Sequence, residues 1–357
     1  MGYKQKYRYH VRALTSFMLC IFYALAFVSC GDRSQPSAIK KTVRNLRVND
    51  SAEKTRRIRL LPYWVPSAQF AGYYVGIKKG IFRKYGIALE ILRFDPTMPM
   101  AQIIRDKQTD FALFWLVNAM SIRDQGVDIV NIAQFSSRSS LLLITKKSSG
   151  ISTLQKMHGK RAGIWIGYEL QPKALFKKFN LDVTIIPIGS TINLFLLGGF
   201  DILNANWFDE YHTVLNSGLN ANELNTFFYV DFGLNFLEDG LYCLDEMTRK
   251  DPELCANFVA AILESWEYAF KYQEEAINIV VKYAKTHNQS VNLSQQRWVL
   301  KQYQELYVPA GKTSLNTELS IKDYGGIGKI MLESAAIAKI VPFFEFYKSY
   351  KTLAKSQ

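Results

Sequence analysis

A basic, aromatic stretch followed by an alternating apolar one occurs twice in this chain, as FRKYGIALEI at 82–91 and as FKKFNLDVTI at 176–185. Later in each half an aspartate opens a short apolar run that leads to a tryptophan, over Asp110–Trp115 and Asp201–Trp207. The spacing between matched positions stays nearly constant. Any two β-α-β units share some likeness, but this repeat favours two similar lobes that face each other.

Strands and helices alternate through both halves. Apolar alternation and short apolar runs predict strands at 57–64, 87–94, 110–114, 129–135, 141–145, 161–165, 183–187 and 201–205. Helical spacing of apolar residues predicts helices at 68–84, 99–107, 117–124, 172–179, 192–197 and 208–217. After these come a last strand at 241–245 and amphipathic helices at 251–272, 274–284 and 293–307. Such alternation is typical of α/β proteins with a mostly parallel sheet covered by helices.

The N-terminus has the features of an exported protein. Basic residues up to Arg12 precede an almost wholly apolar segment at 17–28, as in a secretory signal peptide. Cys30 follows a small residue, which resembles a bacterial lipoprotein motif, although Phe27 stands where leucine is usual. We expect 1–29 to be a lipoprotein signal peptide and Cys30 to carry the lipid. A plain cleaved signal and an uncleaved anchor are the alternatives, and each exports the domain.

The rest of the chain divides into a tether and two lobes. Residues 30–57 are polar with few large apolar side chains, which predicts a flexible tether. The remaining roughly 300 residues are more than one hydrophobic core usually holds. We expect lobe 1 to comprise 58–145 plus 241–357, with the C-terminal helices, and lobe 2 to comprise 146–240.

Composition excludes several classes of protein. The net charge is +13, but the basic residues form no dense stripe with aromatics, so we expect no nucleic-acid partner. The histidines and cysteines lack metal-site spacing, and no nucleophile elbow or phosphate-binding loop occurs. We therefore predict no catalytic residue, no metal and no cofactor. In the folded part only Cys243 and Cys255 remain, as buried thiols or as a disulfide.

Aromatic and amide side chains gather where strands end and helices begin. Ligands of open α/β sheets bind beyond the carboxyl ends of the strands, in sites with apolar walls and a few polar groups. The candidates for ligand binding are Trp64, Gln69, Phe70, Tyr73, Trp115, Gln134, Ser139, Trp165, Gln171, Asn206, Trp207, Glu210, Tyr211 and Glu238. Trp64, Trp115, Trp207 and Tyr211 are expected to stack on a flat ring. Core packing is the alternative for each aromatic residue.

Several longer segments carry a family resemblance. They are 64–86 (WVPSAQFAGYYVGIKKGIFRKYG), 110–119, 207–218 (WFDEYHTVLNSG) and 231–242 (DFGLNFLEDGLY). Through them the chain resembles the periplasmic solute-binding proteins of ABC importers, in the branch that binds thiamine-precursor pyrimidines and is similar to a yeast pyrimidine-synthesis enzyme. The resemblance covers nearly all of 58 to about 310. It implies a bilobal periplasmic-binding-protein-like fold of type II, with two doubly wound lobes and a hinge, expected near 145–149 and near Gly240.

The resemblance also bears on catalysis. Counted from Asp110, Phe114 and Asn118 stand where the synthase relatives carry a lysine and then a histidine that is consumed in the reaction. The run of cysteines of the synthase is missing between Gly233 and Tyr242. Phenylalanine cannot form a Schiff base and asparagine has no imidazole. We therefore expect a binding protein rather than an enzyme.

These expectations combine into one predicted function. The chain would be a lipid-anchored solute-binding protein, facing the periplasm, that delivers an aminomethylpyrimidine-type thiamine precursor to the permease of an ABC importer. Glu210 or Glu238 would accept from the amine and ring nitrogen of the ligand. In one alternative the protein has the same fold but binds nitrate, an alkanesulfonate or taurine. Arg138, beside Ser139, is then the candidate residue for binding the anion. A degenerate pyrimidine synthase is the second alternative.

Overall fold

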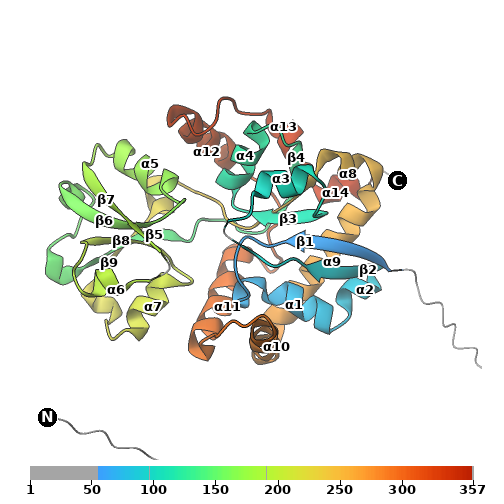
Figure 1. Ribbon diagram of the computed structural model, residues 1–357, viewed down its shortest axis with the longest axis horizontal. Helices are drawn as coiled ribbons and strands as arrows, with labels where there is room; N and C mark the ends of the chain where they lie inside the picture. The colour runs from blue at the N-terminus through green and yellow to red at the C-terminus, as the bar shows by residue number, and fades with distance from the viewer. Residues whose placement is uncertain (1–54, 96, 190, 356–357) are drawn as a thin grey trace, which may run out of the picture. The chain divides into compact units, whose positions relative to one another are not determined.

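The structure is a computed structural model that describes residues 55–95, 97–189 and 191–355 (Figure 1). The predicted signal peptide, Cys30 and the tether as far as residue 54 lie outside these ranges. No helix within them is long and apolar enough to cross a membrane.

Two five-stranded sheets form the cores of two lobes (Figure 1). The first has the order β2-β1-β3-β10-β4 and the second has the order β7-β6-β8-β5-β9. The strands of the first sheet are β1 (Arg56–Leu61), β2 (Ile87–Ile91), β3 (Phe111–Phe114), β4 (Ile129–Gln134) and β10 (Gly240–Leu244). Those of the second sheet are β5 (Leu141–Lys146), β6 (Lys160–Trp165), β7 (Val183–Ile188), β8 (Ile202–Asn206) and β9 (Leu224–Phe228).

The two sheets have the same topology. In the first, β1 runs parallel to β2 and β3, and β10 runs antiparallel to β3 and β4. In the second, β6 runs parallel to β7 and β8, and β5 runs antiparallel to β8 and β9. The expected α/β fold of two doubly wound lobes is therefore confirmed.

Two segments cross between the lobes, 135–140 before β5 and 229–239 before β10. β5 belongs to the second sheet, where Thr145 pairs with Ile202 and Asn225. The expectation of a hinge near 145–149 was therefore wrong, and the sheet of the first lobe ends at β4. The error has a simple cause, because a short apolar run such as that of β5 is equally suited to either sheet.

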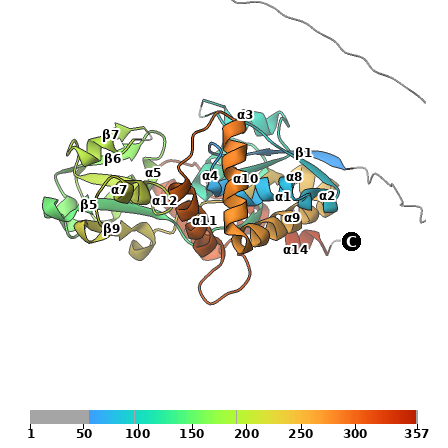
Figure 2. The same ribbon diagram turned by 90° about the horizontal axis from the view of Figure 1, so that it is seen from below.

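Helices cover both sheets (Figures 1 and 2). Those between the strands of the first lobe are α1 (Ala71–Lys78), α2 (Ile81–Lys84), α3 (Met100–Arg105) and α4 (Leu116–Asp124). Those of the second lobe are α5 (Leu170–Lys178), α6 (Asn193–Leu196) and α7 (Glu210–Asn216). The chain after β10 forms α8 (Asp245–Lys250), α9 (Pro252–Lys271), α10 (Gln273–Thr286), α11 (Leu293–Tyr307), α12 (Ile321–Glu333), α13 (Phe343–Phe346) and α14 (Tyr350–Leu353).

Helix α9 shows how local sequence sets these elements. The Asp251 side chain accepts from the Leu254 N–H at 3.0 Å and Pro252 occupies the first turn, as the sequence predicts. α9 packs against α1, which presents Gly72 to the ring of Trp266. A Cβ at Gly72 would lie 2.5 Å from that ring, so a side chain there would separate the two helices.

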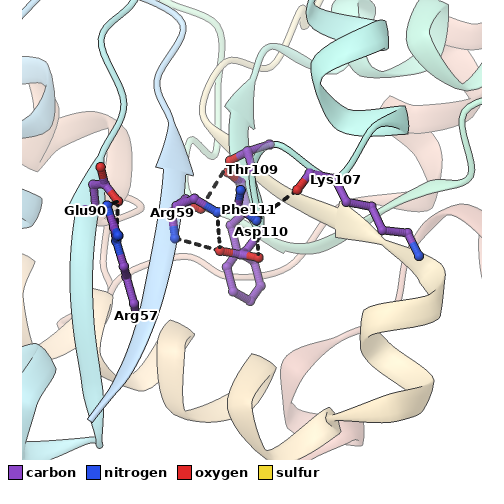
Figure 3. A network of polar contacts seen from close by, with 7 residues as sticks. All are labelled: Arg57, Arg59, Glu90, Lys107, Thr109, Asp110 and Phe111. Carbon is purple, nitrogen blue, oxygen red and sulfur yellow. Dashed lines mark hydrogen bonds and ion pairs between the residues drawn. The ribbon is translucent and has the colours of Figure 1, made fainter.

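An arginine–aspartate clasp occurs in the same place in both lobes. In the first, Arg59 Nε and Nη2 donate to the Asp110 carboxylate at 3.1 and 3.0 Å, and the Asp110 N–H donates to Arg59 O at 3.1 Å (Figure 3). In the second, Arg161 Nε donates to Asp201 Oδ2 at 3.4 Å, and the Asp201 N–H donates to Arg161 O at 2.9 Å. The equivalence of the two aspartates, inferred from sequence, is confirmed.

Candidate functional site

Glu238 joins the two crossing segments. Its side chain is fully buried, and its Oε1 accepts from Ser140 N at 2.9 Å, Ser140 Oγ at 3.0 Å and Ser139 Oγ at 3.3 Å. Its Oε2 has no hydrogen-bond partner among the described residues. One carboxyl oxygen therefore ties the crossings together, while the other can bind a ligand.

Burial changes the protonation of this carboxyl group and its neighbour. It raises the pKa of Glu238 to about 8, an effect that the hydrogen bonds from Ser140 partly oppose. It also raises the pKa of Asp239 to about 6, against the hydrogen bond from the Tyr63 hydroxyl. Glu238 therefore retains its proton at neutral pH, and a ligand that donates to this carboxyl group would favour release of that proton.

The second lobe contributes a second carboxyl group. Ser140 Oγ also lies 3.0 Å from Asn206 Oδ1, so its one hydrogen can serve either this oxygen or Glu238 Oε1, and the Asn206 N–H donates to Glu210 Oε2 at 2.9 Å. Burial, and next the charge of Asp209, raise the pKa of Glu210 well above its usual range. Glu210 and Glu238 are thus linked through Asn206 and Ser140, one from each side of the crossing.

An aromatic contact joins the lobes beside these carboxyl groups. Trp115, which follows β3, lies edge-on to Tyr168 of the second lobe with ring centroids 5.1 Å apart. Trp165, at the end of β6, is half-buried and contacts the same tyrosine at 5.9 Å. Burial, and next the charge of Glu210, raise the pKa of Tyr168.

We call this set the crossing site. It consists of Trp115, Ser140, Tyr168, Asn206, Glu210 and Glu238. Buried polar atoms at or beside it lack a hydrogen-bond partner within the described ranges: Trp115 Nε1, a donor, and Glu238 Oε2 and Gln171 Oε1, acceptors. Gln171 stands in the first turn of α5, just after Tyr168. Buried polar groups are nearly always paired, so these atoms indicate where a polar ligand would bind.

Other expected site residues pack within the first lobe. Gln69, Phe70 and Tyr73 are buried in the turn 68–70 and in α1. The Tyr303 hydroxyl donates to Gln69 Oε1 at 3.4 Å. Between ring centroids, Phe70 lies 5.5 Å from Tyr63, and Tyr73 lies 6.2 Å from Trp266. These are contacts of core packing.

Trp64 and Gln134 lie at the ends of β1 and β4. Trp64 is half-buried and packs on Phe94 with ring centroids 5.7 Å apart. Gln134 is buried, donates through Nε2 to the main-chain oxygen of Glu238 and accepts from Asn131 Nδ2 at 3.3 Å. Gln134 therefore holds the backbone that carries Glu238.

Trp207 and Tyr211 stack on each other rather than on an open face. Their ring centroids lie 4.1 Å apart at an interplanar angle of 22°. Trp207 Nε1 donates to Gln302 Oε1 of α11 at 2.6 Å. One face and the polar atom of this indole are thus occupied by protein.

Sequence reasoning overlooked Tyr168 and the tyrosines around Asp239. Tyr168 follows β6 at the carboxyl edge of the sheet, the same signal that identified Trp115 and Trp165. Asp239 was not among the candidates, although it directly follows Glu238 in the sequence. Its partner Tyr63 follows β1, and the Tyr63 hydroxyl lies 3.1 Å from that of Tyr303 on α11, a grouping that only the fold creates.

A hollow of about 320 Å³ lies at the opposite end of β10 from the crossing site. Its lining includes Arg105, Lys107, Asp128, Glu246 and Arg249. Lys107 forms an ion pair with Glu246, so the charges in this hollow are largely neutralised by protein. It offers no aromatic wall and is not a candidate for the binding of a flat ring.

Among residues 55–95, 97–189 and 191–355, no group of three or more His, Cys, Asp or Glu side chains could hold a metal ion. Cys243 and Cys255 are buried free thiols. Arg138, in the first crossing segment, is exposed.

A model of the protein family described as NMT1/THI5 like matches residues 67–276. The chain belongs to this NMT1/THI5-like family. One relative is 4-amino-5-hydroxymethyl-2-methylpyrimidine phosphate synthase THI5 of Saccharomyces cerevisiae. The two proteins are 22% identical over 295 residues, which cover 77% of this chain and 83% of the yeast protein.

Solved structures share the fold. The periplasmic sulfonate-binding protein SsuA of Methylobacillus flagellatus KT has a TM-score of 0.64 at 14% identity, covering 85% of this chain and 94% of that one. The periplasmic aliphatic sulphonate-binding protein SsuA of Escherichia coli has a TM-score of 0.64 at 12% identity, covering 81% and 91%. The NMT1/THI5-like chain therefore has the periplasmic binding protein fold.

Proposed function

We propose that this protein is the solute-binding component of an ABC importer and that it binds a flat, nitrogen-rich ring of aminopyrimidine type between its lobes. One observation carries the proposal: the crossing site combines two buried carboxyl groups, Glu210 and Glu238, with the aromatic pair Trp115 and Tyr168. No lysine, arginine or histidine is buried in the part of the chain that the structure describes. A neutral or cationic ring with N–H donors suits such a site.

The edge of an aminopyrimidine matches these groups. Ionised Glu238 can accept from the exocyclic amine, and protonated Glu238 can donate to a ring nitrogen. Stacking on Trp115 or Tyr168 would add about 0.5–1.5 kcal/mol per ring pair beyond burial. Trp115 Nε1 supplies a donor for an acceptor on a ring substituent.

The fold and the N-terminal motif support a role outside the cytoplasm. The sulfonate-binding proteins that share the fold are periplasmic by name. We propose that the chain is exported, anchored through lipid on Cys30 to a bacterial envelope membrane, and docks on the permease of an ABC transporter. In this proposal it has no catalytic step.

A synthase role has less support. Phe114 is buried at the end of β3, where it packs on Tyr242 with ring centroids 6.0 Å apart. Asn118 is exposed in α4. Neither side chain can form an imine with a carbonyl cofactor or supply an imidazole. The family relationship to a pyrimidine synthase supports the class of ligand rather than the reaction.

An anion-binding role also has less support, although relatives in fold bind sulfonates. A sulfonate or nitrate ion is normally held by an arginine or by backbone N–H groups. Arg138 is exposed, whereas the buried ionisable groups of the crossing site are carboxyls. Burying an anion beside Glu210 and Glu238 would cost free energy, because no lysine, arginine or histidine is buried among the described residues to compensate its charge.

A thermal-shift screen of the full chain in detergent tests the proposal. The compounds are an aminopyrimidine, thiamine, an alkanesulfonate, taurine and nitrate. At about 100 times its Kd, the aminopyrimidine should stabilise the protein by about 2.7 kcal/mol and raise the melting temperature by several degrees. A rise with the anions alone would replace the pyrimidine assignment by the anion alternative. A rise with none of the compounds would reject both.

The variant Glu238→Gln tests the site itself. Because it removes a carboxyl group that can ionise to accept from the ligand, binding of the aminopyrimidine should weaken by about 10- to 100-fold, which calorimetry measures. Glu246→Gln is the matched control, since Glu246 pairs with Lys107 and Lys250 at the far end of β10. Equal affinities in the two variants would remove Glu238 from the site.

A further inference from the structure

Outside the two crossing segments, hydrogen bonds between the lobes gather on one helix, α11, in the described part of the chain (Figure 2). The other such bond runs from the exposed Lys177 to the main-chain oxygen of Glu333, at 3.2 Å. Hydrogen bonding across the lobe boundary is therefore concentrated in one place.

Two of these contacts are reciprocal. Trp207 Nε1 of the second lobe donates to Gln302 Oε1 of α11 at 2.6 Å. In return, Trp298 Nε1 of α11 donates to the main-chain oxygen of Trp207 at 3.1 Å. The two indoles also touch, with ring centroids 5.8 Å apart.

A second group of contacts lies one helical turn earlier on α11. Gln295 Nε2 donates to Asp209 Oδ1 at 2.8 Å and to Asp209 O at 3.1 Å. Gln295 Oε1 lies 2.6 Å from His212 Nδ1. The imidazole of His212 stacks on Trp298, with ring centroids 4.7 Å apart at an angle of 7°.

α11 itself is fixed to the first lobe. Gln296 Oε1 accepts from the Ala68 N–H at 2.6 Å, and the C-terminal end of the helix meets the first crossing segment, where Ser137 N donates to Leu306 O at 3.1 Å. The residues that bind the second lobe precede this end by one to three turns of the helix. A rotation of the second lobe about the crossings would therefore change these contacts while α11 stays in place.

We propose that Trp207, Asp209 and His212 of the second lobe and Gln295, Trp298 and Gln302 of α11 form a latch that holds the lobes together. Release of this latch accompanies lobe opening. The inference deepens the proposed function, on which it rests for its purpose: the strength of the latch would set the fraction of closed protein and so the affinity for the solute. It assigns Trp207 to lobe closure rather than to stacking on the ligand.

The chemistry of the latch suits a reversible contact. Its polar groups are side-chain amides, indole N–H groups, a carboxylate, an imidazole and main-chain oxygens, all of which bond to water when released. Each bond therefore changes the ratio of closed to open protein by only about fivefold. Several such bonds hold the lobes together, yet none forms a barrier comparable to opening a hydrophobic core.

Distance measurements between spin labels test the latch without any ligand. Labels on Lys78→Cys of α1 and Lys173→Cys of α5, both exposed positions in different lobes, report the separation of the lobes. The full chain is used in detergent, with Cys20→Ser and Cys30→Ser to leave only the buried native thiols. Gln295→Ala combined with Gln302→Ala should lower the closed-to-open ratio by about fivefold for each hydrogen bond lost, and so populate longer distances.

The matched control is Arg297→Ala on the same helix. Arg297 is paired with Glu274 of α10 within the first lobe, so its removal should leave the distances unchanged. Unchanged distances in the double variant, or an equal change in the control, would overturn the latch. If circular dichroism shows that the double variant is unfolded, Trp298→Phe replaces it. This variant keeps an aromatic ring but removes the indole N–H, and the distances between the spin labels are measured in the same way. Because no ligand is used, a failure of pyrimidine binding leaves the result intact.

Discussion

Trp115 and Trp207 occupy matched positions in the two lobes but have different surroundings. Each follows the third strand of its sheet order, β3 or β8. The indole N–H of Trp207 is bonded to Gln302 and its ring is stacked on Tyr211. The indole N–H of Trp115 is buried without a partner among the described residues.

The difference shows how one fold used twice can serve two purposes. The helix α11, which belongs to the first lobe, covers the strand end of the second lobe and satisfies its polar groups. The strand end of the first lobe keeps an unpaired donor and, at Glu238, an unpaired acceptor. An unpaired buried polar group costs about 1–3 kcal/mol, so such groups persist mainly where a ligand pairs with them. The comparison therefore supports the proposal that the ligand binds on the Trp115 side.

The largest expected effect concerns pH and the buried carboxyl group of Glu238. Its pKa is about 8 in the folded protein and about 4.5 in the unfolded chain, so the folded state holds more protons between these values. The contribution of Glu238 to the free energy of unfolding should be highest below about pH 4.5. It should fall by about 1.4 kcal/mol per pH unit up to about pH 8 and then level off. Thermal unfolding of the ligand-free full chain at a series of pH values measures this slope.

Glu238→Gln separates this group from all others. The side chain at 238 can then no longer ionise, so the melting temperature of the variant should fall less steeply between pH 6 and pH 8 than that of the unmodified protein and exceed it at pH 8. The slope that remains includes that of Glu210, whose pKa is also raised. Asp239, with a pKa raised to about 6, adds a slope of the same sign at lower pH in both proteins. Parallel curves for the two proteins between pH 6 and pH 8 would show that Glu238 does not carry the effect.

Substitution of the two tryptophans by phenylalanine should give the next largest effect. Trp207→Phe removes the N–H that pairs with Gln302 and leaves a buried acceptor unsatisfied, which should lower the free energy of unfolding by about 1–3 kcal/mol. Trp115→Phe removes a donor that had no partner. This gain in the free energy of unfolding partly offsets the packing that is lost with the smaller ring. Urea unfolding of both variants compares them, and a larger loss for Trp115→Phe would contradict the assignment of the unpaired side.

The alternation of strands and helices, and the matched aspartates, could be predicted because they are local patterns. The helix expected from residue 251 likewise agrees with α9, which Asp251 caps and Pro252 opens. β9 was missed, since Leu224–Phe228 is short and lacks clean alternation. No helix was expected after α11, although Ser320 and Asp323 form the spacing of a helix cap, and Ser320 Oγ does accept from the Asp323 N–H at 3.3 Å.

The site could be predicted only in part, because its contacts join distant parts of the chain. The rule that ligands bind at the carboxyl ends of strands indicated Trp115 and Asn206, whereas Glu238 was proposed as a polar group in the loop before the last strand. It could not distinguish Trp115 from Trp207, since the partner that occupies Trp207 lies on α11. Pairing between remote segments leaves no signal in a single sequence.

The smallest expected effect concerns the clasps, where the two lobes differ least. The side chain of Arg59 is 34% exposed and forms two bonds to Asp110, whereas that of Arg161 is 47% exposed and forms one longer bond to Asp201. Ion pairs near the surface contribute up to about 1 kcal/mol, and less as exposure grows. Arg59→Ala should therefore lower the free energy of unfolding by about 1 kcal/mol, and Arg161→Ala by a few tenths.

Double-mutant cycles with Asp110→Asn and Asp201→Asn isolate these interactions from the loss of the arginine stem. The coupling energy should be larger in the first lobe, and it should shrink in high salt more strongly for the exposed second clasp. Equal couplings would mean that the main-chain bonds between each pair, which are alike in both lobes, carry the stability and that the side-chain bonds only orient the loop. The clasp would then occur in both lobes because their strands have the same geometry, and not because it stabilises each lobe.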